Sequence, residues 1–151
     1  MGIVDALLGL DLILGRARAV GAEFILAGPL NLWFRGISPP PRDPFYVLIT
    51  SSDYTGILIS ALSIGAKEIP WPESWDNVDG KSFNARLRNY HVTVLTDPII
   101  RNGDKVTRFY AKDLARESMH VILGNNIVRL APLYFEYTLK QVIENVGEVE
   151  K

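Results

Sequence analysis

Two aspartates that flank apolar runs are the first candidates for metal chemistry in this sequence. Asp43 lies near the end of the proline-rich segment "ISPPPRDP" before the run 45–50, and Asp97 follows the run 91–96. Carboxylates gathered at one edge of a sheet bind divalent cations such as Mg²⁺, and Asp97 could lie near the same edge as Asp43. Each aspartate also precedes a proline, which is typical of a turn whose carboxylate accepts backbone hydrogen bonds. The turn interpretation is favoured, because two acids alone would make a poor site for two metal ions.

Other residue types with well-known chemistry are scarce. The chain has no cysteine, which excludes disulfides, thiolate metal ligands and cysteine nucleophiles. His91, beside an apolar strand, and His120, at the start of another, are expected to be structural or surface residues, because two histidines offer no metal-ligand spacing. The sequence contains no Ser-His-Asp pattern, P-loop or GxGxxG turn, so hydrolase, ATPase and dehydrogenase activities are disfavoured.

Nucleic-acid binding has little support in the sequence. The formal net charge is -1, and a protein that binds a polyanion by charge alone needs a basic excess. Trp71 and Trp75 with neighbouring lysines and arginines could form a groove for single strands, but the segment 71–80 also carries acidic residues that would repel phosphates. We expect Trp33 to lie in the core and the other two tryptophans to anchor a loop or face a partner protein. The basic segment 84–90 is expected to be a solvated strand face.

The hydrophobic pattern predicts an α/β (α+β) protein in which helices pack against a mixed β-sheet. Residues 2–20 form an amphipathic helix and not a signal peptide, because Asp5 and Asp11 interrupt the apolar run and no basic region precedes it. Strands are predicted over 23–28 and 45–50, and over 82–97 as two strands or one long bent strand. Residues 120–132 are predicted to form a hairpin around Gly124. Helices are predicted over 30–36, 53–65, 110–119 and 133–148. The length of 151 residues predicts one domain spanning 1–151 and too little chain for two.

Two consecutive units, "FILAGPLNLWFRG" and "PRDPFYVLI", resemble the opening of a minimal nucleotidyltransferase, with the fold shared by DNA polymerase β and the small antitoxin-type nucleotidyltransferases. "SALSIGAKEI" and "LAPLYFEYTLK" resemble later helices of that family, so the likeness covers most of the chain. In the family, a strand ends in Gly-Gly or Gly-Ser, the next strand carries Asp-x-Asp, and a later strand carries a third carboxylate. Those carboxylates hold two Mg²⁺ ions that align an attacking hydroxyl with a nucleotide α-phosphate. The resemblance implies that the segments 24–28, 45–50 and 91–95 are adjacent strands.

Carried over residue by residue, the resemblance implies a degenerate site. Gly28 takes the first Gly position and is a candidate nucleotide-binding residue, whereas Pro29 stands in the second position and has no N–H for a phosphate. Asp43 takes the first Asp position and is the candidate catalytic and metal-binding residue. Phe45 stands in the second Asp position, and Thr93 stands in the position of the third carboxylate. At most one of the three metal ligands remains.

Two further details belong to the same comparison. Lys140, in the closing helix, is a second candidate nucleotide-binding residue. If the alignment slips by one residue, Pro44 and Tyr46 take the two Asp positions and neither carboxylate of that strand survives.

Three functions are therefore expected, in order of preference. The first is a nucleotidyltransferase-fold protein that has lost catalysis and acts as a binding or protein-interaction domain, with a partner protein or itself as a homodimer, and with no cofactor. The second is a divergent active enzyme that uses Mg²⁺ to transfer a nucleoside monophosphate to a hydroxyl, through Asp43 and Asp97 or another acid. The third is an unrelated α/β structural or subunit protein. The absence of cysteine fits a cytoplasmic protein, nine prolines without cysteine would suit a thermophile, and no membrane association is expected.

Overall fold

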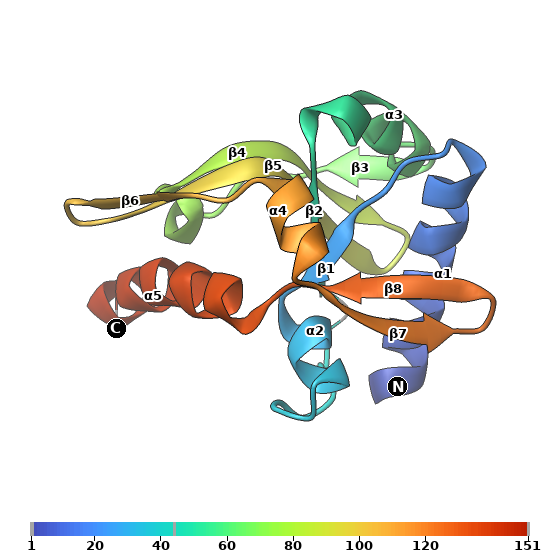
Figure 1. The fold of residues 1–151 in the computed structure, drawn as a ribbon, viewed down its shortest axis with the longest axis horizontal. Helices are drawn as coiled ribbons and strands as arrows, with labels where there is room; N and C mark the ends of the chain where they lie inside the picture. The colour runs from blue at the N-terminus through green and yellow to red at the C-terminus, as the bar shows by residue number, and fades with distance from the viewer. Residues whose placement is uncertain (1, 44, 151) are drawn as a thin grey trace.

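The computed structural model describes residues 2–43 and 45–150, with the side chains of the last helix described as far as residue 143. Its helices are α1 (Gly2–Ala19), α2 (Pro29–Phe34), α3 (Ser52–Leu62), α4 (Ala111–Arg116) and α5 (Leu133–Glu150), with a 3-10 turn η1 (Glu73–Trp75). Its strands are β1 (Ile25–Ala27), β2 (Phe45–Thr50), β3 (Ala66–Glu68), β4 (Val78–Leu87), β5 (Tyr90–Asn102), β6 (Lys105–Arg108), β7 (Met119–Leu123) and β8 (Asn126–Leu130). Figure 1 shows these elements arranged around one sheet.

The strands form one mixed sheet in the order β3-β4-β5-β2-β1-β8-β7, with β6 paired to β5. β2 runs parallel to β5 and β1 runs parallel to β8, whereas the other pairs are antiparallel. The predicted adjacency of the segments 24–28, 45–50 and 91–95 is confirmed, because β2 lies between β1 and β5. The mixed sheet with packed helices predicted from the sequence is also confirmed.

Each face of the sheet has its own apolar core, because successive side chains of a strand point to opposite faces. On one face, α1 and α3 pack over alternate residues of β2, β4 and β5. On the other face, α4, α5 and the turn η1 cover the remaining alternate residues of β1, β2 and β5. Figure 1 shows α1 and α5 well apart, with the strands between them. None of the helices in the described ranges combines the length and hydropathy needed to cross a membrane.

The first helix lies very close to the sheet because a glycine faces it. A Cβ atom at Gly9 would lie 2.2 Å from Tyr46 Oη and 2.7 Å from the ring of Tyr90. With no side chain at that position, the buried Tyr46 hydroxyl reaches the helix and donates to the Ala6 carbonyl at 2.6 Å. Burial is the main cause that raises the Tyr46 pKa above its ordinary value, so this hydroxyl stays a neutral donor.

The element pattern differs from the sequence prediction in three places. The short strands β3 and β6 were not predicted, and β4 begins at Val78 inside a segment that was expected to be a loop. In α5, Tyr134 and Tyr137 are largely exposed, with exposed fractions of 45% and 62%. Only Phe135 of that aromatic group is fully buried, because helical periodicity turns its two tyrosine neighbours away from the core face.

Candidate functional site

Gly28 occupies the turn between β1 and α2, and its conformation requires glycine. Its φ of 84° lies in the left-handed region, and a Cβ atom there would lie 3.0 Å from Val47 Cγ2. Pro29 follows at the first position of α2, where a proline without an N–H is well tolerated. The turn therefore offers the N–H of Gly28 as a donor, whereas Pro29 supplies no second N–H.

That N–H binds a carboxylate of the protein itself. Gly28 N donates to Glu136 Oε2 at 2.9 Å and to Glu136 Oε1 at 3.2 Å. The buried amide of Asn31 donates to the same Oε2 at 2.5 Å and to the Ala131 carbonyl at 3.0 Å. Arg35 holds Asn31 in place by donating to its Oδ1 at 3.1 Å. An internal anion thus lies where the resemblance implies that a nucleotide phosphate would lie.

Glu136 is an unusual carboxylate because only 7% of the residue is exposed. Burial raises its pKa from 4.5 to about 7, although the hydrogen bonds from Asn31 and Gly28 and the charge of Arg35 act in the opposite direction. A low-dielectric environment disfavours the charged form of an acid, which explains the sign of the change. Buried groups with perturbed pKa values beside a pocket are candidates for functional residues.

Gly28, Pro29, Phe45, Glu136 and Lys140 line one pocket of about 410 Å³ between β2, the loop after α2 and α5. The structure thereby brings together both candidate nucleotide-binding residues and two of the degenerate motif positions. Lys140 lies on the exposed side of α5. The roles of Gly28 and Lys140 in binding a nucleotide remain predictions.

Phe45 and Thr93 lie on adjacent parallel strands, as the comparison with the family requires. In the register of β2 and β5, Phe45 is opposite His91 and Val47 is opposite Thr93. Phe45 stacks on the His91 ring with centroids 4.5 Å apart and contacts Trp75 edge to face at 6.4 Å. Aromatic packing therefore occupies the strand position at which the family has its second aspartate.

Thr93 belongs to a hydrogen-bond network with neutral partners. Its Oγ1 donates to Asn84 Oδ1 at 2.9 Å, and His91 Nε2 lies 2.6 Å from the same oxygen. Asn84 Nδ2 donates to the Pro70 carbonyl at 3.0 Å, so Oδ1 is the acceptor and His91 Nε2 carries a proton. Burial, followed by the charge of Arg86, lowers the His91 pKa, which favours the neutral ring. His91 is thus a structural histidine, as the sequence indicated.

Asp43 and Asp97 lie at opposite ends of the β2–β5 pair, so the expectation that they could share one edge is wrong. Asp43 is exposed in a bend before β2, whereas Asp97 follows Thr96, the last residue paired with β2. Asp97 lies within β5 and not in the predicted turn. Its Oδ1 accepts a hydrogen bond from Ala111 N at 2.8 Å, at the start of α4. Among the side chains that the structure describes, those of residues 2–43 and 45–143, no three His, Cys, Asp or Glu residues gather as metal ligands. The described residues do not fit a site for two Mg²⁺ ions.

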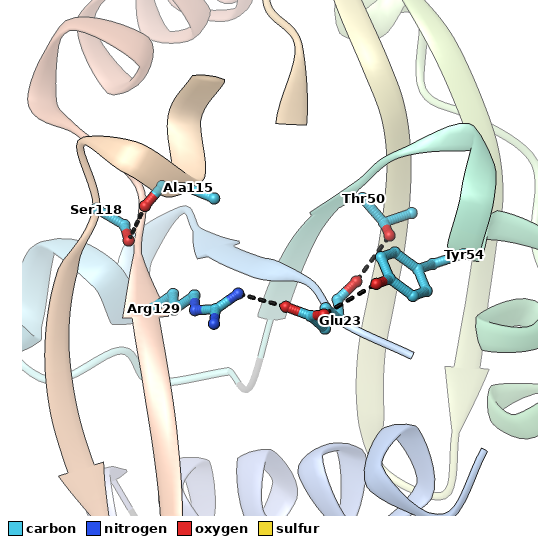
Figure 2. Close-up of polar contacts among 6 residues, drawn as sticks. All are labelled: Glu23, Thr50, Tyr54, Ala115, Ser118 and Arg129. Atoms are coloured by element: carbon cyan, nitrogen blue, oxygen red, sulfur yellow. Dashed lines mark hydrogen bonds and ion pairs between the residues drawn. The ribbon is translucent and has the colours of Figure 1, made fainter. Parts of the chain in front are cut away.

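A second polar cluster surrounds Glu23, just before β1 (Figure 2). Glu23 pairs with Arg129 on β8 and accepts a hydrogen bond from the Tyr54 hydroxyl at 2.9 Å, while its backbone carbonyl accepts from Thr50 Oγ1 at 2.7 Å. The hydrogen bonds from Arg129 and Tyr54 lower the Glu23 pKa. The cluster lines a pocket of about 350 Å³ at the far end of β2 and ties β8, β2 and α3 to the start of β1.

The sequence analysis missed both Glu136 and this second cluster. Glu136 lies 108 residues from Gly28 and Arg129 lies 106 residues from Glu23, so no local spacing connects the partners. One signal was available for Glu136. It stands four residues after Pro132 and three before Leu139, on the same helical face as the apolar residues Phe135 and Leu139, where a carboxylate is exceptional.

Comparison with solved structures agrees with this geometry. The chain superposes on a presumed nucleotidyltransferase from Thermotoga maritima with a TM-score of 0.73 and 16% identity, covering 99% of this chain and 91% of the other. It also superposes on ANT(2″)-Ia, an aminoglycoside nucleotidyltransferase solved with adenylyl-2″-tobramycin, with a TM-score of 0.55 and 13% identity over 87% and 75% of the two chains. No family model and no protein of curated function matches the sequence. The strand order, the Gly28 turn and these superpositions together show that the chain has a nucleotidyltransferase-like fold.

Proposed function

We propose that this protein is a nucleotidyltransferase-fold binding or protein-interaction domain that has lost metal-dependent nucleotidyl transfer. The observation that carries the proposal is the pair of hydrogen bonds from Gly28 N to the Glu136 carboxylate. A phosphate at the same N–H would face a like charge. Two unit charges 4 Å apart repel each other by about 4 kcal/mol at an effective dielectric constant of about 20. A nucleoside triphosphate would therefore have to displace or protonate Glu136.

The positions of the lost carboxylates support the same proposal. Phe45 and Thr93 are engaged with His91 and Asn84 through ring stacking and hydrogen bonds. Neither side chain offers the negative oxygen ligands that Mg²⁺ requires. Asp43, the one acid left in the motif, lies outside the residues that line the pocket. The active alternative would need metal ligands from elsewhere in the chain.

The experiment that tests the proposal is isothermal titration of the protein with ATP, CTP, GTP and UTP, each with and without Mg²⁺. We expect no Mg²⁺-dependent heat with any of the four nucleotides. Asp43→Asn tests the remaining motif acid, and Asp104→Asn, an exposed aspartate in the turn after β5, is its matched control. Mg²⁺-dependent binding that Asp43→Asn abolishes and Asp104→Asn preserves would establish the active alternative instead.

A transfer assay completes the test, because a weakly binding enzyme could escape calorimetry. The protein is incubated with α-labelled nucleoside triphosphates and Mg²⁺, and released pyrophosphate and labelled products are measured. Pyrophosphate release that depends on Mg²⁺ and on Asp43 would overturn the loss of catalysis.

A further inference from the structure

The pocket beside Glu136 has the walls of a site for an apolar ligand. Its apolar lining consists mainly of Phe45, Val47, Trp75, Leu133, Leu139 and Ile143. Its volume of about 410 Å³ lies within the range of small-molecule sites, which is roughly 300–1,000 Å³. A ring or short aliphatic body would bury its surface against these side chains, and burial of apolar area contributes about 25 cal/mol per Å².

The pocket contains a carboxylate with neutral partners. Glu136 accepts hydrogen bonds from one backbone N–H and one side-chain amide. The guanidinium of Arg35 donates instead to Asn31 Oδ1 and to the Ala131 carbonyl at 2.8 Å, and no ion pair to Glu136 occurs among residues 2–43 and 45–143. The two oxygens of a carboxylate can accept about four hydrogen bonds, so Glu136 keeps capacity for another donor.

These features select the chemistry of the ligand. The charge of Arg35 acts on Glu136 without a direct ion pair. A buried charge that lacks a direct ionic partner is costly, and a ligand cation that forms hydrogen bonds with it offsets that cost. An ammonium group supplies the charge and up to three donors, whereas an anionic ligand would be repelled. Lys140 also lines the pocket, but it is exposed, so solvent and salt screen its charge.

We propose that this pocket binds a small primary amine with an apolar body, whose ammonium group donates to Glu136 while the body lies against Phe45, Trp75 and Leu139. The inference rests on the proposed function, because a pocket that received nucleoside triphosphates would need Glu136 displaced. Glu136 is then the residue that determines specificity, because it selects a cationic ligand. A site that binds phosphates selects an anionic one.

The test is a titration of the ¹⁵N-labelled full chain at pH 8, followed by NMR, with three probes of matched size. 2-Phenylethylamine is the cation, 2-phenylethanol the neutral analogue and 3-phenylpropanoate the anion. We expect the amine to shift the Gly28 amide and the Trp75 indole signals and to bind about tenfold or more tightly than the alcohol. The carboxylate should leave both signals unchanged.

Two variants assign the effect to the carboxylate. Glu136→Gln keeps the shape of the side chain and should weaken amine binding about tenfold without changing the affinity for the alcohol. Glu68→Gln, an exposed carboxylate on β3, should change neither. The ¹⁵N spectrum of each variant shows directly that it is folded. Equal binding of amine and alcohol, binding of the carboxylate at Gly28, or an unchanged amine affinity in Glu136→Gln would each overturn the inference.

The same samples separate this inference from the proposed function. ATP, CTP, GTP and UTP with Mg²⁺ are added to the unliganded protein, and the Gly28 signal is monitored. Nucleotide binding that depends on Asp43 would overturn the proposed function, whether or not amines bind. A protein that binds neither nucleotides nor the amine would overturn the amine site alone.

Discussion

Replacing Glu136 by glutamine should stabilise the protein at alkaline pH. The substitution keeps the size of the side chain and an acceptor for Gly28 N or Asn31 Nδ2. It removes the negative charge of a residue of which only 7% is exposed. Glutamine therefore resembles the protonated form of this acid. The difference between the wild type and Glu136→Gln measures what the buried charge costs.

The magnitude follows from the Glu136 pKa, which is about 7 in the folded protein against an ordinary value of 4.5. Each pH unit between those two values is worth about 1.4 kcal/mol, so ionisation costs about 3 kcal/mol of folding free energy. Because the folded state keeps its proton to higher pH than the unfolded chain, this stability is present below pH 4.5. It is lost as the pH rises from 4.5 to 7.

Urea denaturation monitored by tryptophan fluorescence gives the free energy of unfolding. We expect Glu136→Gln to be more stable than the wild type by about 3 kcal/mol at pH 8 and by less than about 1 kcal/mol at pH 5. Glu68→Gln, with its exposed side chain, should stay within about 0.5 kcal/mol of the wild type at both values.

One result would refute this reasoning. If Glu136→Gln were less stable than the wild type at pH 8, the hydrogen bonds to the carboxylate would outweigh the cost of burying its charge. Glu136 would then be a structural anchor for the Gly28 turn, and its folded-state pKa would lie below the ordinary value.

Three other substitutions test contacts of the sheet and of the Gly28 turn, each by the free energy of unfolding in urea. Tyr46→Phe removes the 2.6 Å hydrogen bond to the Ala6 carbonyl and should cost about 1 kcal/mol; an unchanged midpoint would mean that this bond adds nothing. Gly28→Ala places a Cβ atom 3.0 Å from Val47 Cγ2 at a φ of 84° and should cost about 1–3 kcal/mol, whereas a neutral effect would show that the turn relaxes freely. Thr93→Val deletes a buried donor and should cost about 1–2 kcal/mol, and a stabilised variant would show that the hydroxyl is not needed there.

The element types followed from local patterns, except where strands were short and polar. Strand β3 has only three residues, of which Lys67 and Glu68 are exposed, so no alternation could reveal it. Its strand conformation comes from antiparallel pairing with β4, in which Lys67 is opposite Arg86. Strand β6 depends on pairing with β5 in the same way. Pairing between strands is a property of the sheet and leaves little trace in such short segments.

The candidate site was predicted in part. The family comparison led to Gly28, Phe45 and Lys140, which the structure brings to one pocket. The separate expectation that Asp97 could share a sheet edge with Asp43 was wrong, because the direction of the parallel strands β2 and β5 places Asp97 at the end opposite Asp43. A sequence pattern gives the order of strands along the chain. Whether two neighbouring strands run parallel or antiparallel, and so which of their ends lie side by side, depends on how the sheet is assembled.

The sequence by itself determined the properties that depend on neighbours along the chain. These are the helical and strand periodicities, the glycine turn at Gly28, the hairpin turn at Gly124 and the lack of thiol chemistry. The tertiary structure alone decided which charge faces that glycine. Glu136 reaches Gly28 across 108 residues because β1 pairs with β8 and α5 follows β8 directly, over the same face of the sheet. Burial at that contact then sets the Glu136 pKa, because desolvation depends on every element packed around the carboxylate and not on its neighbours in the chain.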